Sequence, residues 1–395
     1  MKWIHFLPIL TLYSMGACAQ LSQDNLVDQS IAVISQQYAP DKRVAIFNVT
    51  SGKNGQTWEL TGETNLPTAK TELLDRLRNA GIDFTDNIRV LQPGRGVVNI
   101  SVCNIRSEPR HSAELATQSL LGTHLRYYKE QNGWYYVQTP DGYLGWLDDG
   151  GFVPMDEKKF DSWNKMDKAF YTAAFGFVYS TPSRESEIIS DLTAGNILAF
   201  QQLTDDWGQV RFPDSRTGYV PAGDIKRYDT WLQQELPDWS QIEKTAREFM
   251  GRPYLWGGTS GKGVDCSGFT KMVYYLHALE LPRDASQQVR VGVEIKTDTT
   301  LSNLVQGDFL FFGRSATADQ PERISHVAIY LGDGKMIHAS DLVQIQSLKR
   351  GDPDFVEYRL KSLVRAKRML KNVSDNGVLR LRDHPEYKII NGSQD

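Results

Sequence analysis

The pattern of apolar and polar positions changes three times along the chain. In the first part, "KRVAIFNV" and "TWELTGE" alternate on either side of the turn "SGKNGQ", which predicts two strands. "TAKTELLDRLRNA" has helical spacing after Leu66-Pro67-Thr68, and "NIRVLQ" predicts a returning strand. We expect a small α+β unit over residues 20–95. It contains no pair of nucleophile and base, so we interpret it as a packing or stabilising module.

An internal repeat of short strands and turns follows. "NIRSEPRHSAELATQSLLG" with "WYYVQTPDGYLGWL" matches "VYSTPSRESEIISDLTAG" with "WGQVRFPDSRTGYV", so that Trp134 corresponds to Trp207. Short strands at this spacing are typical of small β-barrels. We expect two barrels, at residues 97–155 and 170–228. Their aromatic residues either fill two small cores or let one barrel present a binding wall to its neighbour.

From Trp239 the pattern becomes helical and then returns to strands. "WSQIEKTAREFMG" and "DCSGFTKMVYYLHAL" predict two helices. "GDFLFFG", "HVAIYLGDGKMIHAS" and "YRLKSLVRAKRML" predict strands, the middle pair joined by a Gly-Asp-Gly turn. A helix that begins at a cysteine and packs on an antiparallel sheet makes an α+β domain, over residues 239–371. The polar tail, residues 372–395, receives no assignment.

The first residues, 1–19, predict an export signal. Lys2 precedes the apolar run "WIHFLPILTLYSMGA", which is too short for a membrane span, so no transmembrane helix is expected in the mature chain. Ala17-Cys18-Ala19 fits a cleavage site before Gln20, whereas "MGAC" resembles a lipoprotein box that would leave a lipid anchor at Cys18. Both interpretations place the protein in the bacterial cell envelope, either periplasmic or lipid-anchored.

Charge and cysteine content narrow the function classes. Lys and Arg number 44 against 48 Asp and Glu, which argues against a nucleic-acid partner. The chain has three cysteines, of which Cys103 and Cys266 lie beyond the signal. That number excludes zinc ribbons and a disulfide-built fold, and nothing supports a bridge between the two.

Cys266 has the position of a reactive thiol. It follows the Gly-rich "TSGKGVD" at a helix start, where free N–H groups lower a thiol pKa and offer hydrogen bonds to an oxyanion. The partner base must come from elsewhere in the chain. His277 lies three turns down the same helix, too far from the thiol. His326 and His338 can meet across an antiparallel pair, one as the base and the other orienting it.

Two other interpretations of these residues remain open. A single cysteine near a helix start is most often a small buried core residue. Cys266, His326 and His338 also make up the three protein ligands of a catalytic zinc site. We rank zinc lower because Asp265 is the only acidic general base nearby, and we expect neither a metal nor a cofactor.

Several motifs together resemble a known family. "DCSGFT", "SHVAIYLG" and "MIHAS", with "PYLWGG" upstream of the cysteine, are similar to the NlpC/P60 cysteine peptidases, which have a papain-like core. The resemblance covers about residues 240–370. Members with two SH3-like domains and a small N-terminal unit in this order resemble γ-D-glutamyl-L-diamino-acid endopeptidases. Such enzymes cut peptidoglycan stem peptides after γ-D-Glu, prefer a free N-terminal L-Ala and need no cofactor.

The resemblance implies roles for individual residues. Cys266 matches the nucleophile, His326 the general base and acid, and His338 the residue that orients His326. Tyr254, in "PYLWGG", matches a tyrosine that helps to bind the oxyanion. Asp265 matches an acidic residue that faces the substrate amine, with Ser267 beside it.

The resemblance also implies residues that complete the substrate site. Ser286, in "LPRDASQQ", matches a substrate-contacting serine, although Ala285 leaves the register open. Glu114 and Tyr143 of the first barrel match residues that close the amine pocket, with Trp146 competing for the role of Tyr143.

The charge of Asp265 allows an independent interpretation. A carboxylate next to a thiolate disfavours that thiolate, so an unpaired Asp265 would oppose catalysis until a substrate ammonium neutralised it. We therefore expect Asp265 and Glu114 to recognise a free α-amine, unless Asp265 merely caps the helix. Two alternative functions remain: a peptidoglycan-binding protein with an inactive peptidase unit, and an amidase that acts on another cell-wall amide.

Overall fold

The computed structural model describes residues 23–55, 57–297 and 300–388. The predicted signal and Cys18 lie outside the described residues. Within them, no helix combines the length and the apolar character that a membrane crossing requires. The chain divides into two compact units, Met1–Leu91 and Gln92–Asp395.

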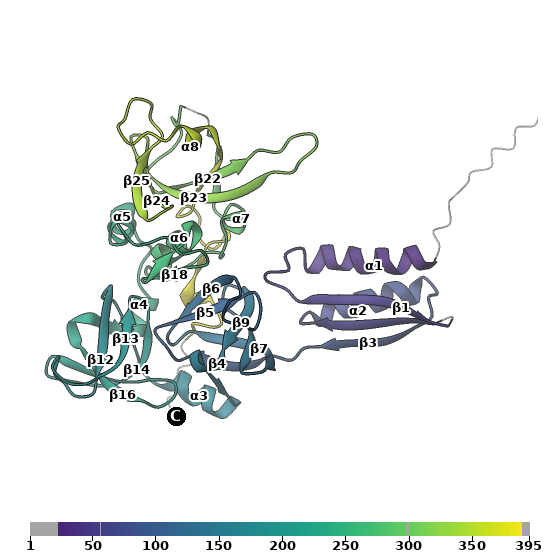
Figure 1. Cartoon of the computed structure of the whole chain (residues 1–395), viewed down its shortest axis with the longest axis horizontal. Helices are drawn as coiled ribbons and strands as arrows, with labels where there is room; N and C mark the ends of the chain where they lie inside the picture. The colour runs from purple at the N-terminus through teal and green to yellow at the C-terminus, as the bar shows by residue number, and fades with distance from the viewer. Residues whose placement is uncertain (1–22, 56, 298–299, 389–395) are drawn as a thin grey trace, which may run out of the picture. The chain divides into compact units, whose positions relative to one another are not determined.

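The N-terminal unit is a three-part α+β arrangement of a hairpin, a crossover helix and a parallel strand (Figure 1). Its elements are α1 (Gln23–Tyr38), β1 (Phe47–Asn54), β2 (Thr57–Thr64), α2 (Pro67–Asn79) and β3 (Phe84–Val90). β1 is antiparallel to β2, and β3 is parallel to β2. The strands and α2 lie where the alternation predicts them. The sequence pattern did not predict α1, which buries Val27 and Ile34 in the same core as Leu73.

The repeat forms two sheets of matching design. The first contains β4 (Gly94–Val98), β5 (Val102–Arg106), β6 (Leu115–Leu120), β7 (His124–Gln131), β8 (Trp134–Gln138), β9 (Leu144–Asp148) and β10 (Phe152–Met155). After α3 (Glu157–Lys165), the second contains β11 (Lys168–Tyr171), β12 (Phe175–Tyr179), β13 (Ile188–Thr193), β14 (Ile197–Thr204), β15 (Trp207–Arg211), β16 (Thr217–Pro221) and β17 (Ile225–Arg227). Trp134 and Trp207 each begin the equivalent strand, β8 or β15, after a tight turn with positive φ at Asn132 or Asp205. We call these sheets barrel 1 and barrel 2.

The C-terminal domain packs short helices on an antiparallel sheet. After α4 (Tyr228–Leu232), the helices are α5 (Trp239–Arg247), α6 (Cys266–Tyr275) and α7 (Ala285–Gln288). The sheet contains β21 (Val293–Ile295), β22 (Asp308–Arg314), β23 (Arg323–Gly332), β24 (Lys335–Ala339), β25 (Val343–Ser347) and β26 (Leu363–Arg368), in the order β21-β26-β22-β23-β24-β25. α6 packs against β23 and β24, and also against β18 (Thr259–Ser260), which reaches β6 of barrel 1 (Figure 1). The predicted α+β class is confirmed.

One strand prediction in this domain is partly wrong. "YRLKSLVRAKRML" begins with a helical turn, α8 (Glu357–Lys361), and pairs with the sheet only from Leu363 onward. Tyr358 and Leu360 alternate with Arg359 and Lys361 as they would in a strand, but Leu360 is buried while Tyr358 is exposed. Arg359 consequently lies on a helical turn beside the sheet.

The tail after residue 371 is an integral part of the fold. β27 (Leu379–Arg380) pairs with β20 (Leu279–Glu280) next to α6, and Leu381 and Tyr387 are buried. Glu386 then forms ion pairs with Arg95 and Arg126 of barrel 1, at 3.3 and 2.6 Å. The tail therefore ties barrel 1 to the C-terminal domain.

Candidate active site

Cys266 is the first residue of α6, and its thiol faces the sheet. The helix begins here because Asp265 is its N-cap, with a carboxylate that accepts a hydrogen bond from the Gly268 N–H at 2.7 Å. The thiol is buried and receives a hydrogen bond from the backbone N–H of Val327 on β23. Val327 directly follows His326, so the helix start brings the thiol to the histidine-bearing strand.

His326 and His338 form a hydrogen-bonded pair. His326 Nε2 lies 2.7 Å from His338 Nδ1, with the rings nearly perpendicular at 86°. His338 Nε2 lies 2.9 Å from the side-chain oxygen of Gln346 on β25, a partner that sequence analysis missed. That oxygen makes His338 Nε2 a donor, so His338 Nδ1 accepts from His326 Nε2–H. Nδ1 of His326 is then its basic nitrogen.

Burial sets the protonation states of these groups. It raises the pKa of the Cys266 thiol to about 11, and the Asp265 charge adds to this effect. Burial also lowers the pKa of His326 well below its usual value, reinforced by the positive charge of Arg359 and by His338. Burial and Arg359 lower the pKa of His338 to about 4. The resting site thus holds a neutral thiol and a neutral imidazole that is ready to accept a proton.

Asp265 is paired in the structure, so the condition of an unpaired carboxylate does not hold. Arg283, which is 1% exposed, holds both of its carboxylate oxygens, at 3.1 and 2.6 Å. The same guanidinium contacts Ser267 Oγ at 3.1 Å. Arg283 therefore neutralises the charge that was expected to await a substrate ammonium, and the helix-capping interpretation of Asp265 describes its geometry. Arg283 lies in "LPRDASQQ", the segment that pointed to Ser286, but no local pattern signals its partner.

Barrel 1 contributes directly to the surroundings of the site. Arg283 Nε donates to Thr117 Oγ1 on β6 at 2.9 Å. The Thr259 N–H donates to the side chain of Gln118 at 2.9 Å, and Trp256 Nε1 donates to Glu114 Oε1 at 2.7 Å. The buried pair of Asp265 and Arg283 is therefore bonded to a strand of the barrel.

The other predicted residues include two of barrel 1, Tyr143 and Trp146, and Tyr254 of the C-terminal domain. Tyr143 is buried, and its hydroxyl donates a hydrogen bond to the Asp284 carboxylate at 3.1 Å. Asp284 is the N-cap of α7, the short helix that carries Ser286. Trp146 packs against the Tyr136 ring. Tyr254 is partly buried, and burial together with the charges of Cys266 and Asp265 raises its pKa. Its phenol therefore stays protonated and able to donate.

The geometry also bears on the zinc alternative. Within residues 23–55, 57–297 and 300–388, no group of three His, Cys, Asp or Glu side chains is arranged to hold a metal ion. The facing nitrogens of His326 and His338 are engaged with each other. Cys103 and Cys266 are both free thiols, and Cys103 is buried in barrel 1.

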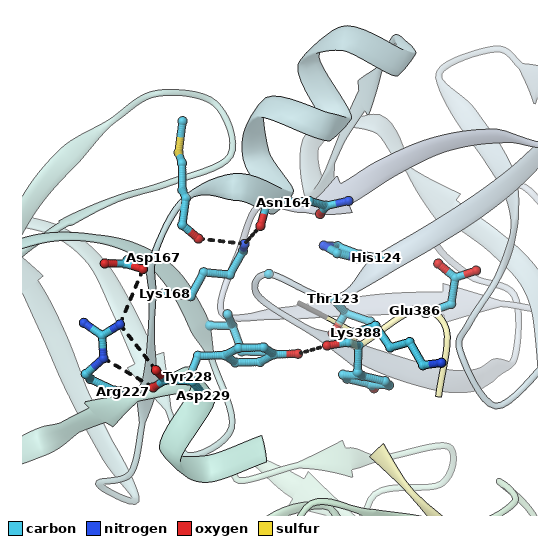
Figure 2. Close-up of a pocket in the computed structure, with 14 residues that line it drawn as sticks. Thr123, His124, Asn164, Asp167, Lys168, Arg227, Tyr228, Asp229, Glu386 and Lys388 are labelled. Carbon is cyan, nitrogen blue, oxygen red and sulfur yellow. Dashed lines mark hydrogen bonds and ion pairs between the residues drawn. The ribbon is translucent and has the colours of Figure 1, made fainter. Parts of the chain in front are cut away.

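A separate cavity of about 300 Å³ lies where barrel 1, α3, barrel 2 and the tail meet (Figure 2). Lys168, Arg227 and Glu386 of its lining are bound within the fold. Lys168 Nζ donates to three backbone carbonyls of the α3 end, and Arg227 pairs with Asp167 and Asp229. No residue of the Cys266 site lines it. We interpret this cavity as a junction between structural parts.

Comparisons with known proteins agree with this geometry. Residues 251–359 match the NlpC/P60 family, and residues 105–151 match the bacterial dipeptidyl-peptidase Sh3 domain. The chain is 28% identical to the gamma-D-glutamyl-L-lysine dipeptidyl-peptidase of Bacillus cereus, over 62% of this chain and 73% of the relative. It is also 28% identical to dipeptidyl-peptidase 6 of Lysinibacillus sphaericus, over 65% of this chain and 93% of the relative.

A solved structure shows the same fold. The crystal structure of an NlpC/P60 family protein from Bacillus cereus superposes with a TM-score of 0.59 at 24% identity. The match covers 70% of this chain and 99% of that one.

Proposed function

Because this chain carries an NlpC/P60 domain after a bacterial dipeptidyl-peptidase SH3 domain, we propose that it is a cysteine peptidase of peptidoglycan stem peptides. The bond we propose is the amide between γ-D-Glu and the diamino acid. One observation carries the chemistry: a buried thiol at a helix start faces a strand whose histidine is oriented by a second histidine and a glutamine. The names of the two peptidase relatives support the choice of bond.

Acyl transfer follows from these groups. His326 Nδ1 takes the Cys266 proton as the sulfur attacks the γ-carbonyl carbon, so that the resting neutral pair becomes thiolate and imidazolium only at the moment of attack. The tetrahedral oxyanion accepts hydrogen bonds from the Tyr254 hydroxyl and the N-terminus of α6. The C–N bond then breaks as His326 protonates the leaving amine, which leaves a γ-glutamyl thioester. Water attacks the thioester carbonyl as His326 removes a water proton. The C–S bond then breaks, the γ-carboxylate of D-Glu is released, and His326 returns the proton to the Cys266 thiolate.

The first barrel supplies the proposed amine specificity. Asp265 is neutralised by Arg283, so Glu114 contributes the negative charge that remains for an N-terminal ammonium. Glu114 is exposed, and the Trp256 indole N–H orients its carboxylate. Tyr143, Ser267 and Ser286 are the further residues that we propose to contact the substrate. An N-acetylated or glycan-linked peptide has no ammonium to offer Glu114, so free peptides are the proposed substrates.

The proposed place of action lies outside the cytoplasm, where peptidoglycan is found. The predicted export signal supports this assignment, and the choice between a periplasmic protein and one anchored through a lipid at Cys18 follows from how that signal is cleaved. Mass spectrometry of the intact protein from its own envelope fraction distinguishes the two, because lipidation adds the mass of the acyl chains to an N-terminal cysteine.

Cleavage of defined peptides tests the proposed activity. L-Ala-γ-D-Glu-meso-diaminopimelate, free and N-acetylated, is incubated with the protein and with Cys266→Ala, with and without a chelator, and products are identified by mass spectrometry. We expect cleavage of the free peptide only, lost in Cys266→Ala and indifferent to the chelator. Cys103→Ala is the matched control, because it removes a buried thiol from the core of barrel 1. Chelator-sensitive cleavage would favour zinc chemistry, and no cleavage of either peptide would refute the proposed bond.

Glu114→Gln tests the amine pocket separately. We expect a higher KM for the free peptide at nearly unchanged kcat, since the variant removes a binding charge and leaves the thiol and histidines untouched. An equal loss for the free and the acetylated peptide would contradict an amine-binding role of Glu114.

A further inference from the structure

Arg359 stands beside the catalytic groups, on the helical turn that sequence analysis assigned to a strand. Its guanidinium carbon lies 5.6 Å from the centroid of the Phe312 ring, and that ring lies 5.8 Å from the ring of His326. Phe312 therefore contacts both a fixed positive charge and the ring of the proposed base. The positive charge of Arg359 also interacts electrostatically with Cys266 and Tyr254.

This cation lacks a counter-ion. Its Nε is buried and makes no hydrogen bond within the described part of the chain. Among the same residues no carboxylate lies within ion-pair distance of it, and its neighbours are the Phe312 and Tyr358 rings and the Tyr358 hydroxyl. Arginine presents a planar fork of donors that fits a carboxylate. A half-buried arginine without an anion, next to a reactive thiol, has the character of a binding group for an anion that arrives with the substrate.

We propose that Arg359 binds a substrate carboxylate that flanks the scissile amide. This inference rests on the proposed function, because a γ-D-glutamyl–diamino acid bond has a free carboxylate on each side. D-Glu is linked through its side chain, which leaves its α-carboxylate free, and a diamino acid at the peptide end carries its own α-carboxylate. Both lie only a few bonds from the carbonyl carbon that Cys266 attacks.

Carboxylate binding at Arg359 has a consequence for the base. The Arg359 charge opposes protonation of His326 in the free protein. An anion on the guanidinium cancels that opposition, so the pKa of His326 rises toward the working pH once substrate is bound. A base with a pKa nearer the working pH accepts the thiol proton more readily. The same contact therefore selects an anionic substrate and strengthens the general base for it.

The test uses three peptides that differ in one carboxylate: L-Ala-γ-D-Glu-L-Lys, the same peptide with the D-Glu α-carboxamide, and the same peptide with a C-terminal lysine amide. Steady-state kcat/KM is measured for the unaltered protein, Arg359→Gln and Arg359→Lys. Arg365→Gln is the matched control, because Arg365 is a more exposed arginine of the neighbouring strand that pairs with Glu322 and Glu294.

We expect one of the two amidations to lower kcat/KM at least tenfold in the unaltered protein, which identifies the bound carboxylate. Arg359→Gln should lower kcat/KM on the diacid peptide and abolish that discrimination, while Arg359→Lys keeps part of it and Arg365→Gln keeps all of it. Arg359→Gln should also move the acidic limb of the pH profile of kcat/KM to higher pH.

Different failures separate the two proposals. Cleavage of none of the peptides by the unaltered protein would refute the proposed function. Cleavage of all three at equal rates would overturn the role of Arg359 while leaving the activity in place. Equal losses on all three peptides in Arg359→Gln, with the discrimination preserved, would show that Arg359 acts only through packing. Arg359→Lys keeps the charge and the stem of the side chain, so it supplies the same comparison where the glutamine variant folds poorly.

Discussion

Replacing Arg283 by methionine tests the buried ion pair that joins the helix start to barrel 1. The substitution keeps the apolar stem and removes the guanidinium, which leaves the Asp265 carboxylate buried with hydrogen bonds from the Gly257 and Gly268 N–H groups at 3.0 and 2.7 Å. Breaking a buried ion pair by removing one partner costs about 3–5 kcal/mol. The two remaining backbone donors place the expected loss at the lower end, about 3 kcal/mol in the free energy of unfolding.

The same variant should also weaken the nucleophile. In the folded protein the Asp265 charge raises the pKa of the Cys266 thiol, and the Arg283 charge lowers it. Arg283→Met leaves only the unfavourable charge, so the thiol pKa should rise further and kcat should fall at a given pH. Iodoacetamide alkylation of Cys266, followed by mass spectrometry as a function of pH, measures this shift directly.

A double-mutant cycle separates the ion pair from other effects of the substitution. Urea unfolding of Arg283→Met, Asp265→Asn and the double variant is followed by tryptophan fluorescence. All but two of the nine tryptophans lie in the unit Gln92–Asp395, so the signal reports mainly on that unit. The double variant leaves no unpaired charge and should lose at least about 1 kcal/mol less than the sum of the single variants. Additive losses, or a cost for Arg283→Met below about 1 kcal/mol, would refute the ion-pair argument.

Three further predictions follow from the geometry. Burial and Arg359 lower the pKa of His326, so kcat/KM should hold steady as pH falls through 6.5 and decline only well below it. A pH profile in which kcat/KM is halved at pH 6.5 or above would contradict this. Gly257→Ala should lower the free energy of unfolding in urea by at least about 1 kcal/mol, because φ is +77° and a Cβ would meet the Leu115 carbonyl oxygen at 2.1 Å. Gly223→Ala is the control, and it should change the free energy of unfolding little because a Cβ there has no atom within 4 Å. Glu386→Gln should speed limited proteolysis of the tail, since it removes the ion pairs to barrel 1, and an unchanged cleavage rate would show that apolar packing alone holds the tail.

The sequence predicted the positions of Cys266, His326 and His338, the proposed reacting groups, because their signals are local. Cys266 follows a Gly-rich segment and an N-cap, and a turn with positive φ at three successive residues, 332–334, returns the chain so that His338 meets His326. Gln346 and Arg283 were missed because each acts through contacts made across the fold. Nothing in the residues around them indicates those contacts.

The misassigned strand has a different cause. Alternating apolar residues continue through the segment before β26, and period alone does not reveal where sheet pairing starts. The pairing begins at Leu363, and the residues before it form a helical turn. Arg359 was therefore not predicted as a site residue, because a charged residue on a strand would be expected on the exposed face of the sheet.

A buried network of hydrogen bonds joins barrel 1 to the start of the helix that carries Cys266. Thr117 of β6 accepts a hydrogen bond from Arg283, Arg283 holds Asp265, and Asp265 caps the helix whose first residue is Cys266. Each link is buried, so loss of the Thr117 hydroxyl would leave the Arg283 Nε–H without its acceptor inside the protein, which is costly. The peptidase domain thus depends on the barrel for the position and electrostatics of its thiol. A barrel that only tethered the protein to the cell wall would need no buried bond to the helix start.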